Sequence, residues 1–174
     1  MKIVVISYSL TGNNETLANR IAKELAVEHI IIKEAKPRTI GSIILDLILN
    51  RTPKVQPTPD KLENYDLIIM FGPIWMGKVA TPLRTYLKNL NKNQQRYAYI
   101  SISGGADGVN PKLAGELNKI AGEFPVVLLD LHIADLLPSG QNSVRKETSA
   151  YKITQEDINK LSIAIMKTLM EANL

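Results

Sequence analysis

Residues 3–16 read IVVISYSLTGNNET, and they are the most informative stretch for the fold class. Its first four residues are apolar and β-branched, which predicts a short strand buried on both faces. Hydroxyl and amide side chains follow directly, and Leu17, Ile21 and Leu25 then recur at the spacing of one helix face. A buried strand, a polar turn and an amphipathic helix therefore begin the chain.

The same alternation continues to the end of the chain. Helical apolar spacing recurs at 83–90 and 113–120, and a last helix is expected at 155–170, where Thr154 and Asp157 are spaced as a capping box. Short, mostly β-branched runs separate the helical stretches. They occupy 29–32, 67–70, 97–102 and 125–129.

Five strands that alternate with helices predict an α/β protein. The expected architecture is a doubly wound parallel sheet with helices on both faces, three layers in all. Ligands of such sheets bind beyond the carboxyl ends of the strands, so function is expected in the loops after Ser7, Phe71 and Ser101.

Composition limits the remaining possibilities. A chain of 174 residues buries roughly 70% of its unfolded surface in one core, so we expect a single domain over residues 1–174. The chain has no Cys, which excludes disulfides, thiolate metal sites and cysteine nucleophiles, and with two His we predict no metal site. Residues 1–6 lack the features of a signal peptide or membrane span, so a cytoplasmic protein is expected.

The chain is basic, with a formal net charge of +4 and a pI near 9.2. A basic balance raises the question of a nucleic-acid partner. Only 5% of residues are aromatic and the sequence has no Lys/Arg run, so no nucleic-acid partner is expected.

The loop after the first strand is rich in neutral hydrogen-bond donors and precedes a helix. Backbone N–H groups at a helix start attract an anion, and a phosphate is the expected ligand. The loop has neither the Lys of an ATPase P-loop nor the glycines of a dinucleotide fingerprint, which leaves neutral donors. The alternative is a plain N-cap turn in which Asn13 or Asn14 closes the helix.

The loops after the third and fourth strands complete the candidate site. The first of them, Gly72 to Lys78, holds the only Trp of the chain, Trp75, whose flat ring suits stacking on a planar ligand. The next loop, 101–108, contains two adjacent glycines that permit close approach to a ligand. Asn110-Pro111, which follows this loop, is typical of a helix start. The alternatives are a Trp75 packed in the core and a flexible turn without a ligand.

The three loops together resemble those of the flavodoxin-like family. The resemblance rests on Tyr8 to Asn13, on the GPIWMG run at 72–77 with Thr81-Pro82-Leu83, and on the SGG run at 103–105, and it covers the whole chain in order. It implies a sheet order of 2-1-3-4-5 and FMN as cofactor. The site residues it implies are Ser9, Leu10, Thr11, Gly12, Asn13 and Asn14 at the phosphate, Pro73, Ile74, Trp75, Met76 and Gly77 beside the flavin, and Ser103, Gly104 and Gly105 at its pyrimidine side.

The sequence departs from the family in three respects. Asn14 stands where the family has Thr, which replaces a hydroxyl by an amide. The third loop has Gly104, Gly105 and Ala106 where carriers of the family have an aromatic over the outer flavin face, so that face is predicted to be open. Carriers of the family are also strongly acidic, whereas this chain is basic.

The resemblance implies a redox protein whose chemistry belongs to the flavin. We expect an oxidoreductase that moves electrons from NAD(P)H, or from a redox protein, to a quinone-like or other small acceptor. The alternatives are a flavodoxin-type electron carrier between protein partners and a binding module without cofactor. The last is disfavoured because all three loops keep ligand-compatible residues.

Other classes are excluded by particular residues. A response regulator needs an Asp where this chain has Phe71, and no Gly-x-Ser-x-Gly of a serine hydrolase occurs. His132 and Asp130 are interpreted as structural rather than as an acid–base pair. We therefore predict no catalytic side chain.

Two further stretches carry weaker hypotheses. The apolar segment Ile40 to Leu49 is predicted to serve as a lid or in a homodimer, or else as a helix buried on the sheet. Basic residues follow the Trp75 loop with no acidic residue from 72 to 96, and they are predicted to steer an anionic partner, or else to form a solvated helix face. They are Lys78, Arg84, Lys88, Lys92 and Arg96.

Overall fold

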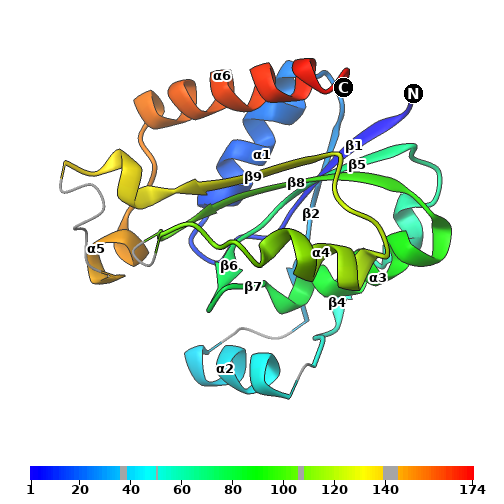
Figure 1. Cartoon of the computed structure of the whole chain (residues 1–174), viewed down its shortest axis with the longest axis horizontal. Coiled ribbons are helices and arrows are strands. Elements are labelled where there is room, and N and C mark those ends of the chain that lie inside the picture. The colour runs from blue at the N-terminus through cyan, green and yellow to red at the C-terminus, as the bar shows by residue number, and fades with distance from the viewer. Residues whose placement is uncertain (36–38, 50, 106–107, 139–144) are drawn as a thin grey trace.

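The computed structural model describes residues 1–174 except 36–38, 50, 106–107 and 139–144. Its central sheet has five parallel strands in the order β2-β1-β5-β8-β9 (Figure 1). Counted within this sheet alone the order is 2-1-3-4-5, which confirms the predicted fold class. The strands are β1 (Ile3–Ser7), β2 (Glu28–Ile31), β5 (Leu67–Phe71), β8 (Arg96–Ser103) and β9 (Val127–His132).

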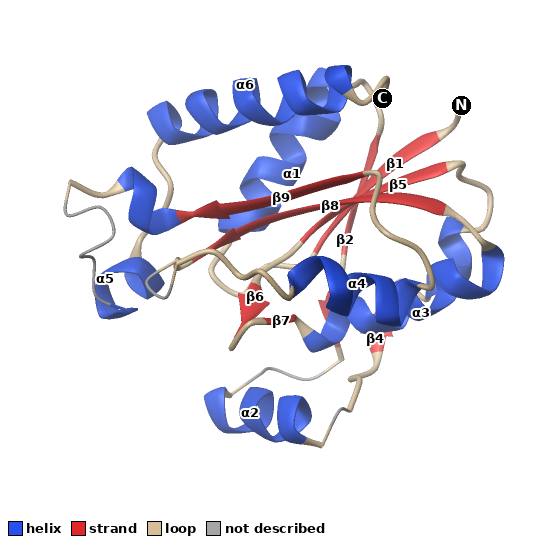
Figure 2. Ribbon diagram, viewed as in Figure 1, coloured by secondary structure: helices blue, strands red, loops and turns tan. Residues whose placement is uncertain are grey.

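Helices cover both faces of the sheet, as the sequence predicts. One face carries α1 (Asn13–Glu24) and α6 (Gln155–Glu171), and the other carries α3 (Thr81–Asn93) and α4 (Leu113–Ala121) (Figure 2). Alternate strand residues supply the two cores. Val4 of β1 packs in the cluster beneath α3 and α4, whereas Val5 packs in the cluster beneath α1 and α6.

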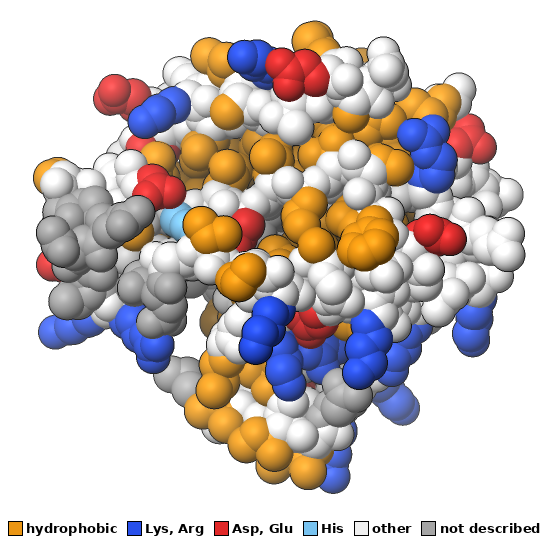
Figure 3. Space-filling view, in the orientation of Figure 1, with side chains coloured by type: hydrophobic (Ala, Val, Ile, Leu, Met, Phe, Trp, Pro, Cys, Tyr) orange, Lys and Arg blue, Asp and Glu red, His pale blue; other side chains and the backbone are white. Residues whose placement is uncertain are grey.

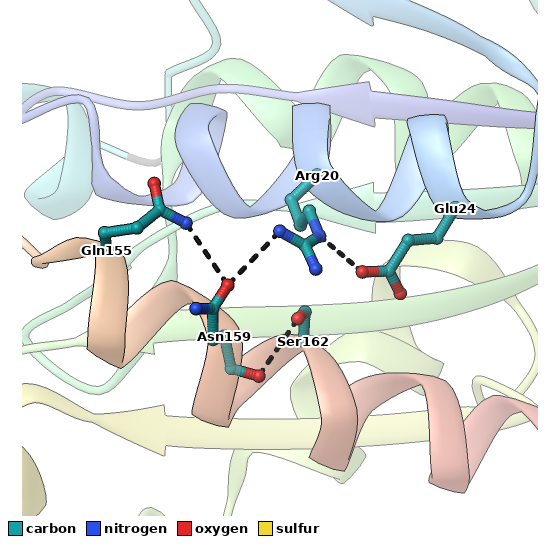
Figure 4. Close-up of polar contacts among 5 residues, drawn as sticks. All are labelled: Arg20, Glu24, Gln155, Asn159 and Ser162. Carbon is teal, nitrogen blue, oxygen red and sulfur yellow. Dashed lines mark hydrogen bonds and ion pairs between the residues drawn. The ribbon is translucent and has the colours of Figure 1, made fainter.

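The two helices of the first face are also joined along their exposed edge (Figure 4). Arg20 of α1 forms an ion pair with Glu24 and donates to Asn159 Oδ1 of α6 at 3.3 Å. Gln155 donates to the same oxygen at 3.2 Å. The predicted capping box at the start of α6 is confirmed, since Thr154 Oγ1 accepts from the Asp157 N–H at 3.2 Å and Asp157 Oδ2 accepts from the Thr154 N–H at 2.8 Å.

Several short elements extend beyond the carboxyl edge or the faces of the sheet. The helix α2 (Ile40–Ile48) lies outside the α3–α4 layer, on an excursion whose ends pair as the short antiparallel strands β3 (Lys33–Glu34) and β4 (Val55–Gln56) (Figure 1). After β5, the strands β6 (Ile74–Trp75) and β7 (Lys78–Val79) form a hairpin. The remaining elements are η1 (Pro59–Leu62), η2 (Ile133–Leu136) and α5 (Arg145–Ala150).

Among the described residues, no helix combines the length and the apolar character that crossing a membrane requires.

Two glycines with opposite surroundings test the packing of α3 and α4. A Cβ on Gly72 would lie 2.0 Å from Leu83 Cδ1, whereas a Cβ on Gly115 in α4 would meet nothing within 4 Å. We predict that Gly72→Ala destabilises the protein by about 1–3 kcal/mol through overpacking. Gly115→Ala should instead stabilise it by about 0.5–1 kcal/mol through helix propensity.

Urea unfolding of the two variants beside the parent protein measures both effects. Equal unfolding midpoints for Gly72→Ala and the parent would contradict the close packing of β5 on α3.

Candidate functional site

One cavity joins the three loops at the carboxyl ends of β1, β5 and β8. Its volume is about 770 Å³, within the range of roughly 300–1,000 Å³ that is usual for small-molecule sites. It also receives side chains from α2, from the end of β9 and from α5. Of the residues predicted from the sequence, those in its lining are Leu10, Ile74, Trp75, Met76, Gly77, Ser103, Gly104 and Gly105.

The other predicted residues are not part of the cavity's lining. Pro73 accepts the Ala80 N–H at 3.2 Å and so closes the base of the β6–β7 hairpin. The others belong to the first loop and the start of α1, which continue from Leu10. They are Ser9, Thr11, Gly12, Asn13 and Asn14.

The first loop is shaped around Gly12. This glycine is the N-cap of α1 with φ 94°, a conformation that side chains other than glycine rarely adopt. Its N–H donates to Ser9 Oγ at 2.9 Å, which folds the loop back on itself. The first-turn N–H groups of α1 have no acceptor within the helix, so this loop presents donors and a positive dipole end.

The side chains of Asn13 and Asn14 have structural roles, and their donation to a phosphate stays a prediction. Asn14 Nδ2 donates to the Ile102 carbonyl at 2.9 Å, and Asn14 Oδ1 accepts the Ile102 N–H at 3.0 Å. Asn13 makes the same pair of bonds to the carbonyl of Tyr151 and the N–H of Ile153, at 2.9 and 3.2 Å. Both amides are buried, so they fasten the loop to β8 and to the segment before α6.

The segment held by Asn13 brings a cation to the first loop. A Cβ placed on Gly12 would lie 3.9 Å from Lys152 Nζ. Lys152 is 140 residues away in the sequence, and sequence reasoning, which expected neutral donors alone, missed it. Its neighbour Tyr151 is fixed in turn, because its hydroxyl donates to Asp157 Oδ2 at 2.8 Å.

Trp75 occupies the hairpin after β5 and is half-buried. Its ring meets that of Tyr8 edge to face, with centroids 5.8 Å apart and an interplanar angle of 81°. It thus packs against the core beneath α3 and α4 and also lines the cavity, which combines the two alternatives that the sequence left open. Met76 and Gly77 form the turn with φ 51° and 74°, and Met76 is 77% exposed at the cavity rim.

Asn110 joins the hairpin to the third loop. Its Nδ2 donates to the Gly77 carbonyl at 2.7 Å, and its Oδ1 accepts the Lys112 N–H at 3.2 Å. The helix expected to start at Asn110-Pro111 therefore begins later, at Leu113. The side chain that looked like a helix cap is used to connect two loops.

The paired glycines of the third loop are explained by protein packing. A Cβ on Gly104 would lie 2.9 Å from Thr148 Oγ1 of α5, and one on Gly105 would lie 2.3 Å from His132 Cβ. The sequence predicts that these glycines let a ligand come close, whereas the neighbours that the structure gives them are Thr148 and His132. Ala106, which entered the prediction of an open outer face, lies outside the described residues.

The end of β9 adds a polar pair to the cavity wall. His132 Nε2 lies 3.3 Å from Asp130 Oδ2, and His132 Nδ1 lies 3.9 Å from Asp135 Oδ2. The hydrogen bond to Asp130 raises the pKa of His132 above its ordinary value, against the lowering effect of burial. Asp130 Oδ1 is buried and has no hydrogen-bond partner among the described residues.

Helix α2 closes one side of the cavity. Ile43, Ile44 and Leu47 line it, while Ile48 on the same helix is 73% exposed. The helix lies outside the α3–α4 layer, so the alternative of a helix buried on the sheet is wrong (Figure 1). A cover over the cavity agrees with the lid hypothesis, and self-association stays a prediction.

The predicted basic stripe is divided in the structure. Arg84 is buried, and its Nη2 pairs with Glu116 Oε1 of α4 at 3.1 Å, because α4 packs over this part of α3. The alternative of a solvated helix face is therefore wrong for this residue. Lys78 and Lys88 line a second hollow with residues of α4, which Lys92 and Arg96 do not reach.

Comparison with known proteins finds solved structures of similar fold. No family model matches the chain. A flavoprotein from Lactobacillus acidophilus NCFM, solved in complex with FMN, is 23% identical over 78% of this chain and 95% of its own, with a TM-score of 0.59. A flavodoxin from the domain Archaea aligns over 100% of both chains at 15% identity with a TM-score of 0.54.

A third solved structure also has a similar fold. The flavodoxin, WrbA-like protein from Agrobacterium tumefaciens aligns over 99% of this chain and 97% of its own, at 12% identity and a TM-score of 0.52. Together with the sheet order, these likenesses show that the chain has a flavodoxin-like fold.

The two histidines provide a pH test of the site. Burial lowers the pKa of His29, whereas the hydrogen bond to Asp130 raises the pKa of His132. His29 Nε2 forms a 2.8 Å hydrogen bond with Ser7 Oγ. Proton NMR titration should therefore give two imidazole pKa values on opposite sides of about 6.5. Asp130→Asn should lower the higher value and leave the other unchanged.

Because the pKa of His132 is raised in the folded protein, its protonation favours the folded state. The protonated His132 stabilises the fold below about pH 6.5, and this contribution disappears as the pH rises through the folded-state pKa. Two coincident titrations, or no response to Asp130→Asn, would contradict the His132–Asp130 pair.

Proposed function

We propose that this protein binds FMN in the 770 Å³ cavity and uses it as an oxidoreductase. The observation that carries the proposal is the meeting of three loops, from the ends of β1, β5 and β8, around one cavity in a flavodoxin-like fold. A protein of similar fold was solved with FMN. The loops therefore have the arrangement that a mononucleotide with one planar ring would need.

The phosphate end would lie at the start of α1. Gly12 leaves space where another residue would place a side chain, and the first-turn N–H groups and the Thr11 hydroxyl supply donors. Lys152 adds one positive charge beside this space. The side chains of Asn13 and Asn14 would hold the loop in shape, since their amides are already bonded elsewhere.

The ring would lie between the hairpin and the third loop. Trp75 and Ile74 provide an apolar wall, and Ser103 to Gly105 provide the opposite edge. The buried Asp130 Oδ1 is an acceptor without a partner among the described residues, and the flavin pyrimidine carries one N–H that such an acceptor suits. The residues present thus fit the group.

FMN, when bound, would supply two-electron chemistry between a reduced nicotinamide, which is left oxidised, and a quinone-like or other small acceptor, which is reduced and takes its second proton from solvent. The chain would hold the ring, shield one side with α2 and keep a proton on His132 at mildly acidic pH. The alternative function is a flavodoxin-type carrier between proteins. The basic balance of the chain and the cavity's extent beyond the three loops favour the oxidoreductase.

Flavin binding can be measured through the only Trp of the chain. FMN should quench the fluorescence of Trp75 by stacking near it, and FAD should bind much more weakly because the loop suits one terminal phosphate. Thr11→Ala removes a hydrogen bond to a charged group and should weaken FMN about ten-fold. Unchanged FMN affinity in Thr11→Ala would place the phosphate elsewhere.

The contribution of Lys152 to phosphate binding can be measured by comparing the affinities for FMN and for riboflavin. Lys152→Gln should weaken FMN several-fold, most at low salt, and should leave riboflavin affinity unchanged because riboflavin has no phosphate. Lys160→Gln, an exposed lysine of α6, is the matched control and should change neither. A parallel loss of riboflavin affinity in Lys152→Gln would show that Lys152 acts on the loop's shape and not on the phosphate.

An anaerobic measurement of flavin absorbance distinguishes the oxidoreductase from the electron carrier. An oxidoreductase of the proposed kind should lose its yellow flavin absorbance when NADH or NADPH is added. A carrier should keep that absorbance until a reductase partner is supplied.

A further inference from the structure

A second hollow adjoins the proposed flavin cavity and is strongly basic. Its volume is about 620 Å³, and it lies between α3, α4 and the β6–β7 hairpin. Figure 3 shows basic side chains gathered below α4, with a carboxylate among them and the apolar side chains of α2 beside them. The charged residues that line it are Lys78, Arg84, Lys88, Lys112, Lys119 and Glu116.

Among the described residues, Glu116 is the one carboxylate in the lining, and it is already engaged by the protein. Glu116 Oε1 pairs with Arg84 Nη2 at 3.1 Å, and Glu116 Oε2 accepts the Val79 N–H at 2.9 Å. This partly buried pair fixes α4 against α3 and against the hairpin. The lysines around it therefore give the hollow an excess of positive charge that Glu116 does not balance, and such a concave site attracts anions.

The hollow and the flavin cavity share one wall. Met76, Gly77 and Asn110 line both, and the 2.7 Å bond from Asn110 Nδ2 to the Gly77 carbonyl holds that wall in place. A molecule with its charged part in the hollow could thus extend past Met76 toward the Trp75 wall. A flat, acidic protein surface would not fill a concave site of this size, so a small ligand is favoured.

We propose that this basic hollow binds the phosphates of a dinucleotide electron donor whose nicotinamide reaches the flavin cavity across Met76. The inference rests on the proposed function for the redox partner, but the anion site itself depends only on the hollow. Lys88 of α3 and Lys119 of α4 face it from two helices, so they would contact phosphate from two sides.

The first test uses inorganic pyrophosphate as the probe, in calorimetric titrations with and without saturating FMN. Lys88→Ala/Lys119→Ala should weaken pyrophosphate binding about ten-fold or more, because each lysine donates a charge-assisted hydrogen bond. The control, Lys23→Ala/Lys92→Ala, removes the same charge from exposed positions outside the hollow and should leave the affinity unchanged. Equal affinities in all three proteins, or equal losses in both variants, would overturn the anion site.

The second test measures flavin reduction by NADPH and by 1-benzyl-1,4-dihydronicotinamide, a hydride donor without phosphates. Lys88→Ala/Lys119→Ala should slow reduction by NADPH and lower its dependence on salt, while the rate with the benzyl compound stays unchanged. Slower reduction by an acidic redox protein, with no pyrophosphate binding, would overturn the proposal in favour of a protein-docking surface.

Failure of the proposed function gives a different result. If FMN does not bind and pyrophosphate still binds in a manner that Lys88→Ala/Lys119→Ala abolishes, the anion site stands and the flavin proposal falls. If FMN binds and pyrophosphate does not, the flavin proposal stands and the anion site falls.

Discussion

The buried amide of Asn14 is the contact on which the geometry of the candidate site depends. Its two hydrogen bonds to Ile102 join the first turn of α1 to the end of β8, so the first and third loops cannot move independently. The adjacent Asn13 does the same for residues 151–153, which carry Lys152. Because both amides are buried, their loss would leave backbone groups unsatisfied, a cost of about 1–3 kcal/mol for each. Two neighbouring side chains thus hold the first loop, where we propose that the phosphate binds, against the rest of the site.

The fold could be predicted from the sequence because its signals are local. Period and β-branching identified all five strands of the central sheet, and the capping box at Thr154 placed the last helix. The three loops were identified because parallel strands place their carboxyl ends at one edge. Helix α2 was recognised as unusually apolar, but its position over the cavity depends on the pairing of β3 with β4. Strands of two residues are too short to be predicted from a sequence pattern.

The contacts that the sequence did not reveal are all long-range. An Asn at a helix start is equally suited to bind an anion or to fasten another segment, and only the approach of Ile102 and Tyr151 decides between them. Arg84 has the spacing of an exposed stripe, but α4 covers it with Glu116. Lys152 and Asp130 lie far from the loops in sequence. The signal that could have found Lys152 is its place two residues before the cap of α6, at the carboxyl edge of the sheet where the first loop also lies.

A crystal structure of the protein grown with FMN would show whether the three loops bind FMN with its phosphate at Gly12 and its ring beside Trp75. We expect phosphate density against the first-turn N–H groups of α1 within reach of Lys152 Nζ, and ring density between the hairpin and Ser103 to Gly105. Flavin density at any other surface, or a phosphate bound without contact to residues 9–14, would contradict it.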